Sequence, residues 1–216
     1  MPRLILASSS PRRHELLKAT GLAFEIARPD IDETPHRGEA PGEYVLRLSR
    51  EKALAVGAAI QGTDSIDAII ISADTTVAEG EHILGKPADA AEAAAMLRRL
   101  RGHAHSVYTG VSVLDTSGAT GSEPASTLTS SHVTLRALSE PEIAAYVASG
   151  DPLGKAGSYA IQNAAFRPVE RLEGCYTNVV GLPLCALCGL LRQHGIELAV
   201  PIHCSPTELP CRFGAL

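Results

Sequence analysis

Residues 6–17, LASSSPRRHELL, place three serines, a proline and two arginines between an apolar run and a helical pattern. Ser10 before Pro11 predicts a helix start, because serine caps helices and proline suits the first helical position. The first N–H groups of that helix then point back toward the preceding strand, beside Arg12 and Arg13. A helix N-terminus with guanidinium groups can receive a phosphate. A capped surface helix with two solvated arginines is the alternative that these residues leave open.

A lysine interrupts the apolar face of a second helical pattern, at residues 41–60. The apolar stripe of this pattern consists of Val45, Leu48, Val56 and Ala59. At about 100° per residue, Lys52 falls in the middle of the stripe, whereas Arg47 falls on the far side. A lysine in such a position either extends its ammonium group to the rim of the core or meets a buried negative partner.

Carboxylates supply the complementary chemistry. Asp74 directly follows an apolar run at residues 68–73, which is typical of a strand buried on both faces. Ligands of open α/β sheets bind beyond the carboxyl ends of strands, so we expect Asp74 at such an end. Lys86, between a glycine and a proline, adds a cation. An acidic cluster, for which a solvated loop is the alternative, consists of Asp30, Asp32 and Glu33.

The elements that position these residues mix strands with helices. We predict strands at residues 3–7, 68–73, 105–114 and 126–138, with a hairpin turn at 79–81. We predict helices at residues 11–20 and 41–60, from a cap at Asp89 to about Arg101, from a capping box at Ser139 to near Gly150, and in the segment LPLCALCGLLRQHG. This pattern indicates an α/β fold with a mixed sheet. Residues 1–199 are expected to form one domain, and the proline-containing residues 200–216 an irregular tail.

Composition excludes several functions. The net charge of −5 and the absence of tryptophan argue against a nucleic-acid-binding protein. The apolar run near the N-terminus is too short for a signal peptide, and no stretch approaches the roughly 18 apolar residues of a membrane span, so we expect a cytoplasmic location without membrane contact. Cys185 and Cys188 form a C-x-x-C that could be redox-active or half of a zinc site. In an apolar helical pattern, buried reduced thiols are the favoured interpretation.

Six motifs occur in an order that resembles one known family: LASSSPRRHELL, SADTT, LGKP, LRRLRGHAHSVYTGVSV, KAGSYAIQ and VVGLPL. The chain resembles the Maf family of nucleoside triphosphate pyrophosphatases over about residues 4–192. The resemblance implies a mixed, twisted sheet in two lobes with a central nucleotide cleft, similar to the inosine triphosphate pyrophosphatase (Maf/Ham1) fold. It also implies hydrolysis between the α- and β-phosphates, help from Mg²⁺ or Mn²⁺, and a homodimer.

The resemblance also assigns roles to residues. Catalysis falls to Asp74, Glu33, Lys52 and Lys86, with Glu33 and Asp74 as metal ligands, and phosphate binding to Ser8, Ser10 and Arg13. Arg12, Thr75 and Gln162 occupy positions that determine base specificity, and all three resemble the branch that hydrolyses dTTP and UTP.

Other segments differ from that branch. Asn163, Ala164 and Ala165 replace a glycine-rich stretch, and residues 30–35 and 170–174 are more like the sister branch that hydrolyses 7-methyl-GTP. That substrate is one alternative. A nucleotide-binding regulator of septum formation with little catalysis is the other.

Overall fold

The computed structural model describes residues 2–61, 67–117 and 123–197, and its central feature is one mixed sheet. The strand order is β2-β1-β3-β5-β6-β7, with β4 paired to β3. Strand β1 is parallel to β2 and β3, and the other pairs are antiparallel. The strands are β1 (Arg3–Ala7), β2 (Glu25–Ala27), β3 (Ala68–Glu79), β4 (His82–Leu84), β5 (Ala104–Asp115), β6 (Ala125–Leu135) and β7 (Val169–Glu173). The expected α/β fold with a mixed sheet is therefore confirmed.

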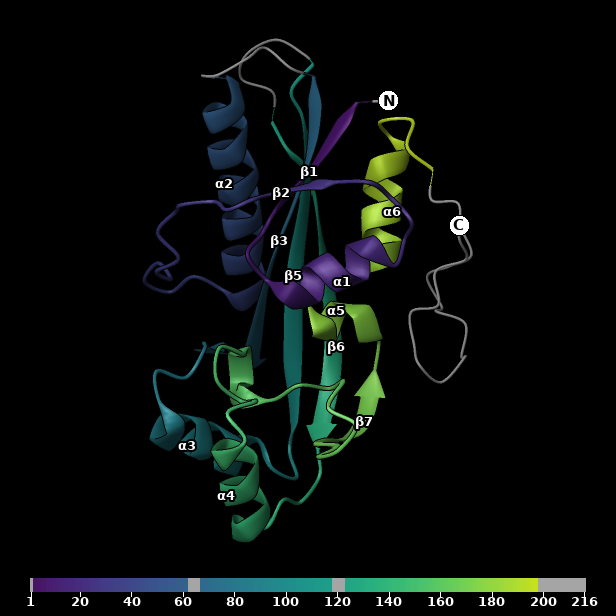
Figure 1. Cartoon of the computed structure of the whole chain (residues 1–216). Coiled ribbons are helices and arrows are strands. Elements are labelled where there is room, and N and C mark those ends of the chain that lie inside the picture. The colour runs from purple at the N-terminus through teal and green to yellow at the C-terminus, as the bar shows by residue number, and fades with distance from the viewer. Residues whose placement is uncertain (1, 62–66, 118–122, 198–216) are drawn as a thin grey trace.

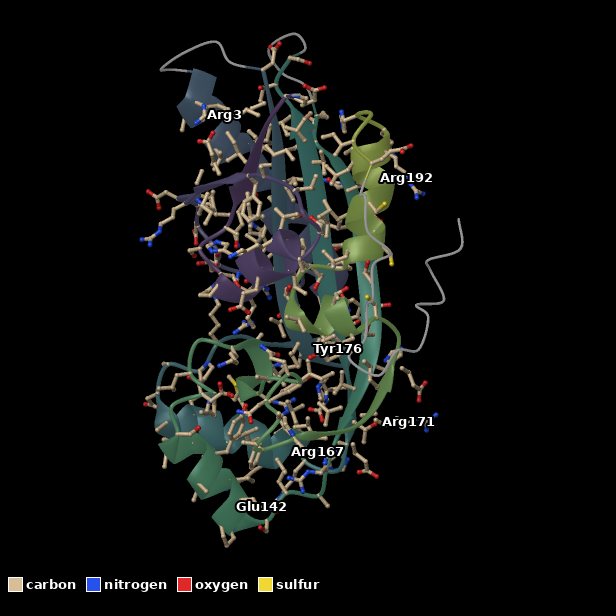
Figure 2. The ribbon with its side chains drawn as sticks, turned by 45° about the vertical axis from the view of Figure 1, so that its right-hand side comes forward. Arg3, Glu142, Arg167, Arg171, Tyr176 and Arg192 are labelled. Carbon is tan, nitrogen blue, oxygen red and sulfur yellow. The ribbon has the colours of Figure 1, made fainter. Side chains whose placement is uncertain are left out.

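Helices pack on the sheet in two lobes (Figure 1). They are α1 (Pro11–Lys18), α2 (Pro41–Gln61), α3 (Ala90–Leu100), α4 (Glu140–Ala148), the 3₁₀ turn η1 (Ala156–Ser158), α5 (Tyr176–Val180) and α6 (Leu184–Arg192). The upper lobe contains β1, β2, α1, α2 and α6, and the lower lobe contains β4, β7, α3, α4 and η1. The long strands β3, β5 and β6 run through both lobes, as Figure 1 shows. In Figure 2, Arg3 and Arg192 mark the upper lobe, Glu142 and Arg167 the lower, and Tyr176 of α5 lies between them.

The alternation of side chains along β1 and β3 determines which helix each face meets. Ile5 and Ile70 face α2, where they join Val56 in one apolar cluster. Leu6 and Ile71 face the opposite side and pack with residues of α6. Successive side chains of a strand point to opposite faces, so both faces of this sheet are buried in the upper lobe.

Local signals for the lower-lobe helices are confirmed. Asp89 caps α3 by accepting a hydrogen bond of 2.8 Å from the N–H of Glu92. Ser139 and Glu142 form the expected capping box at the start of α4. The tight turn between β3 and β4 has Gly80 at φ +59°, a left-handed conformation that glycine adopts without strain.

Several boundaries differ from the sequence-based expectations. Helix α1 ends at Lys18 and β6 at Leu135, each a few residues before the predicted end. Ala59, which we placed on the apolar stripe, is exposed. Ser10 occupies the N-cap position of α1, but its hydroxyl makes no capping hydrogen bond. The Ser8 hydroxyl accepts from the N–H of Ser10 instead, at 3.1 Å.

The cysteines divide into two groups. Cys175 is buried as expected, whereas Cys185 and Cys188 are partly exposed, so their predicted burial is wrong. The leucines of α6 occupy its inward positions and leave the two thiols on its flank. Cys204, Cys211 and the predicted tail at 200–216 lie outside the described residues. Within those residues, no helix combines the length and apolar character needed to span a membrane.

Candidate active site

A cavity of about 330 Å³ between the two lobes brings the predicted site residues together. The upper lobe contributes residues 8–13 at the start of α1, two loop residues (Pro29 and Glu33) and Lys52 of α2, and the lower lobe contributes the segment around η1. All ten residues singled out from the sequence line this cavity, namely Ser8, Ser10, Arg12, Arg13, Glu33, Lys52, Asp74, Thr75, Lys86 and Gln162. They come from six separate stretches of the chain, so the fold itself assembles them.

The register between β1 and β3 explains why the serine-rich segment and Asp74 meet. Ala7, the last residue of β1, lies opposite Ser72 of the parallel strand β3. The chain therefore leaves the sheet at Ser8, beside Asp74. We expected Asp74 at a strand end, and this prediction is wrong. Strand β3 continues past Asp74 to Glu79 because it pairs with the antiparallel strand β5. The cavity therefore lies beyond the end of β1 and not beyond the end of β3.

Lys52 forms the electrostatic centre of the cavity. Asp74 shares a face of β3 with Ile70 and Ser72, so it points toward α2. The Lys52 ammonium lies 2.5 Å from Asp74 Oδ1 and 2.6 Å from Glu33 Oε1, and Lys52 is only 5% exposed. The buried negative partner, one of the two explanations for an inward lysine, is therefore confirmed. Partial burial favours the neutral form of Glu33, but the hydrogen bond and charge of Lys52 outweigh it and lower the Glu33 pKa.

Arg13 is held in a fixed orientation by groups from three elements. Its Nε donates to the carbonyl oxygen of Gly181 at 2.8 Å, and its Nη2 donates to Thr75 Oγ1 at 3.1 Å. The remaining nitrogen, Nη1, lies 3.5 Å from Ser8 Oγ. Burial lowers the pKa of Arg13, and the charge of Asp74 opposes that shift. Arg13 is thus a preoriented cation beside the carboxylates.

Thr75 has a position that its expected role did not anticipate. It faces the side of β3 opposite Asp74, where its hydroxyl contacts Thr109 Oγ1 at 2.9 Å as well as Arg13. Among the cavity residues, Thr75 therefore contacts the Arg13 guanidinium group. A role for Thr75 in base specificity stays a prediction, and the geometry adds that Thr75 orients Arg13.

The other predicted residues lie at the edges of the cavity. Lys86 is exposed, with its ammonium 3.8 Å from Glu33 Oε2. Arg12 lines the cavity; burial lowers its pKa, and the charge of the lower-lobe residue Asp151 opposes that shift. Gln162 is exposed and lines the cavity from that lobe.

The loop that carries Glu33 is tied to α2. Tyr44 donates its hydroxyl to the carbonyl oxygen of Glu33 at 2.9 Å, and Arg47 donates to the carbonyl oxygen of Thr34 at 3.2 Å. Arg47 also pairs with Glu39 at 2.7 Å. The face of α2 opposite its apolar stripe therefore positions a site residue. Asp32 accepts from the N–H of Thr34 in a local turn, so of the acidic cluster only Glu33 lines the cavity.

Sequence reasoning missed Lys155, Tyr159 and Asp151. Lys155 and Tyr159 line the cavity, and Asp151 contacts Lys155. Both cavity residues belong to the motif KAGSYAIQ, and its lysine, which directly follows Gly154, is the signal that could have indicated them. Asp151 lies outside the motif, and the sequence gives no sign of its partners.

The residues present fit a hard divalent cation. Among the described residues, no group of three or more histidine, cysteine, aspartate or glutamate side chains could enclose a metal ion. Mg²⁺ needs no such cage, because it is commonly held by one or two carboxylates together with water and substrate phosphates. Glu33 and Asp74 supply two carboxylates around Lys52, and each has an oxygen not engaged by that ammonium group.

A buried lysine between two carboxylates, flanked by further cations in a cleft of an α/β fold, defines a site for chemistry on a polyphosphate. The chain belongs to the Maf family, because the family profile described as Maf-like protein matches residues 3–194.

Curated relatives match over most of their length. A dTTP/UTP pyrophosphatase of Pelotomaculum thermopropionicum is 48% identical over 198 residues, which are 92% of this chain and 100% of that protein. A dTTP/UTP pyrophosphatase of Hahella chejuensis is 49% identical over 196 residues, covering 91% and 94% of the two chains.

Solved structures show a partial likeness. A HAM1 protein from Coxiella burnetii matches with a TM-score of 0.40 and 17% identity, over 64% of this chain and 75% of that one. A dITP/XTP pyrophosphatase from Mycobacterium abscessus matches with a TM-score of 0.35 and 14% identity, over 63% and 75%.

Proposed function

We propose that this protein is a nucleoside triphosphate pyrophosphatase that hydrolyses dTTP and UTP to the nucleoside monophosphate and pyrophosphate. The observation that carries the proposal is the arrangement of Asp74, Lys52 and Glu33 in a cleft that also contains Arg13. Relatives that are 45–49% identical to this chain are named dTTP/UTP pyrophosphatases, which supports the proposed substrates. We also propose that residues 1–199 form one domain.

The proposed reaction adds one water molecule across the bond between the α- and β-phosphates. Asp74 accepts a proton as the water oxygen attacks phosphorus, and pyrophosphate leaves with the electrons of the broken P–O bond. Arg13, Lys52 and Lys86 offset the negative charge that develops on the phosphate oxygens. Ser8 and Ser10, at the start of α1, bind further phosphate oxygens.

We propose that a divalent cation, Mg²⁺ or Mn²⁺, binds at Glu33 and Asp74 when substrate is present. When bound, the cation supplies Lewis-acid polarisation of phosphate oxygens. Lys52 holds the two carboxylates close together in the absence of that charge, because its ammonium group contacts both. The carboxylates are therefore positioned before a cation arrives.

Base selection is assigned to the lower end of the cleft. Gln162 lines it with an amide that can both donate to and accept from a neutral pyrimidine edge. Arg12 and Thr75 complete the proposed specificity set. The family resemblance implies a glutamate at this position in the 7-methyl-GTP branch, and a carboxylate there can only accept a hydrogen bond unless it is protonated. The alternative substrate 7-methyl-GTP is therefore disfavoured by the amide.

The test is a nucleotide panel. Purified protein is incubated with Mg²⁺ or Mn²⁺ and with dTTP, UTP, dCTP, dATP, GTP and 7-methyl-GTP, and pyrophosphate, monophosphate and orthophosphate are assayed separately. We expect equal amounts of pyrophosphate and monophosphate, with dTTP and UTP as the best substrates. Release of orthophosphate alone would refute the bond assignment. Tight nucleotide binding without turnover would favour the septum-regulator alternative.

We propose a homodimer in the cytoplasm, on the resemblance to the family alone. Size-exclusion chromatography with light scattering tests the first point, and fractionation of the source cells tests the second.

A further inference from the structure

Asp151, in the loop between α4 and η1, is surrounded by donors from its own lobe. Its Oδ2 accepts from the Tyr146 hydroxyl at 2.6 Å and from Asn163 Nδ2 at 3.0 Å. Its Oδ1 accepts from Lys155 Nζ at 3.0 Å. Burial favours the neutral carboxyl group, but these three hydrogen bonds outweigh it and lower the pKa of Asp151. Both carboxylate oxygens are therefore engaged by the protein, which suits a positioning role rather than a catalytic one.

Lys155 extends this arrangement to the cavity. Its ammonium group donates to the Asp151 carboxylate and to the Asp151 carbonyl oxygen. A lysine ammonium has three N–H donors, so these two acceptors leave one for a ligand. The Lys155 side chain is 14% exposed and lines the cavity. Asp151 thereby points a cation into the cleft from the side opposite Lys52.

The surroundings of Lys155 differ from those of the cations in the upper lobe. Val77, Val107, Ala156 and Ala160 line the cavity on this side. Tyr159 also lines it, but its hydroxyl is engaged by His105 Nε2 at 2.8 Å. Lys155 and Gln162 are thus polar side chains set in a mostly apolar wall. A neutral, planar base fits such a wall, because ligand pockets combine apolar surfaces with a few placed polar groups.

Asn163 links Gln162 to the same carboxylate. It follows Gln162 in the chain, donates to Asp151, and accepts from the N–H of Phe166 at 2.8 Å through its side-chain oxygen. Asn163, which replaces part of the glycine-rich stretch of the dTTP/UTP branch, therefore fixes the loop that carries Gln162. Both polar groups of the lower wall depend on Asp151.

We propose that Lys155 donates a hydrogen bond to the 4-keto oxygen of a pyrimidine base and that Asp151 is the residue that positions it. This inference rests on the proposed function. Uracil and thymine present a carbonyl oxygen at that place, whereas cytosine presents an amino group. A lysine ammonium cannot accept a hydrogen bond, so it selects the keto form and disfavours the amino form. Lys155 is thus a specificity residue that separates dTTP and UTP from dCTP and CTP.

The test compares dTTP with dCTP in four proteins: wild type, Lys155→Met, Asp151→Asn and the double variant. We expect Lys155→Met to lower kcat/KM for dTTP by about tenfold to a hundredfold, mainly through KM, because a buried hydrogen bond to a charged group is lost. Activity toward dCTP should change less than about threefold, on the same reasoning. Asp151→Asn should reproduce most of the loss. The double variant should lose less than the sum of the two single losses, because Asp151 acts mainly through Lys155 and to a smaller extent through the Gln162 loop.

The measurement on wild type distinguishes a failure of the proposed function from a failure of the proposed role of Lys155. If wild type does not release pyrophosphate from dTTP, the proposed function fails. If it does, but Lys155→Met lowers dTTP and dCTP turnover equally, Lys155 serves the phosphates or the fold and this inference fails. Additive losses in the double variant would overturn the positioning role of Asp151. Lys18→Met, an exposed lysine of α1 outside the cavity, is the matched control and should behave as wild type.

Discussion

Replacing Lys52 with methionine tests the electrostatic centre of the site through protein stability. Methionine fills much of the volume of the lysine stem, so the packing of α2 against the sheet changes little. The charge is lost, however, and leaves Asp74 buried at 7% exposure without its closest cation. Arg13 offsets part of that charge from a greater distance.

The expected loss of stability follows from the burial of Asp74. Removing one partner of a buried ion pair costs about 3–5 kcal/mol, because the remaining charge is left uncompensated. We expect about 3 kcal/mol for Lys52→Met, at the lower end, because Arg13 and solvent at the cleft reduce the penalty. Asp74→Asn removes that charge, so the double variant should recover about 2 kcal/mol of the loss.

The assay is urea unfolding of wild type, both single variants and the double variant at neutral pH. Lys86→Met is the matched control. It removes a lysine from the same cavity, but that lysine is 64% exposed and 3.8 Å from Glu33, so it should cost less than about 1 kcal/mol. If Lys52→Met cost no more than Lys86→Met, or if the two single losses were additive, Lys52 would not be the charge that balances Asp74.

Three further predictions concern other parts of the structure. Burial lowers the pKa of His105 to about 4, so the stability it contributes is full above about pH 6.5 and is lost as pH falls toward 4. Wild type should lose about 2 kcal/mol more than His105→Gln between about pH 7.5 and pH 5, measured by urea unfolding, and equal losses would contradict this. Gly110→Ala should lower Tm, at a cost of about 1–3 kcal/mol, because its Cβ would lie 2.5 Å from the Val45 carbonyl oxygen; Gly189→Ala, with open space around it, should not. Gln162→Glu should reduce kcat/KM for dTTP more than for purine triphosphates, whereas Arg13→Ala should depress all substrates together; a uniform loss in Gln162→Glu would remove that residue from base selection.

The sequence predicted the elements that have strong local signals. The apolar runs of β1 and β3 and the caps at Asp89 and Ser139 are local, and each led to an element that exists. The continuation of β3 beyond Ala73 has no such signal. Its polar residues are held in the strand by pairing with β5, which lies about thirty residues further along the chain.

The edge strands were missed for a related reason. Strands β2 and β7 each pair on one side only, and most of their side chains are exposed. They therefore lack the apolar alternation that marks a half-buried strand. The burial of Cys185 and Cys188 was overestimated because an apolar helical pattern does not reveal where its inward face ends.

The candidate site was predictable in its residues but not in its contacts. Unusual placements, such as a lysine on an apolar stripe, marked some of the residues that line the cavity, whereas Thr75 and Gln162 were named only from the family resemblance. The contacts of Thr75 with Arg13 and of Asp151 with Lys155 depend on how distant segments pack, and no spacing in the sequence encodes them. Residue types and the family resemblance together therefore predicted the chemistry of the site, but not its geometry.

Continuous strands across both lobes have a consequence for how a ligand enters. Asp74 lies inside the ladder that joins β3 to β5, opposite Gly110, and the same ladder extends into both lobes. The two lobes therefore share one continuous sheet. A hinge rotation between the lobes would have to disrupt the backbone hydrogen bonds between β3 and β5 at the site itself. We expect the cleft to open by movement of its surface segments, at residues 28–40 and 151–168, while the carboxylate stays still. In hydrogen exchange, the amides of β3 around Asp74 should then be equally protected with and without nucleotide, and the ligand-dependent protection should be confined to those two segments.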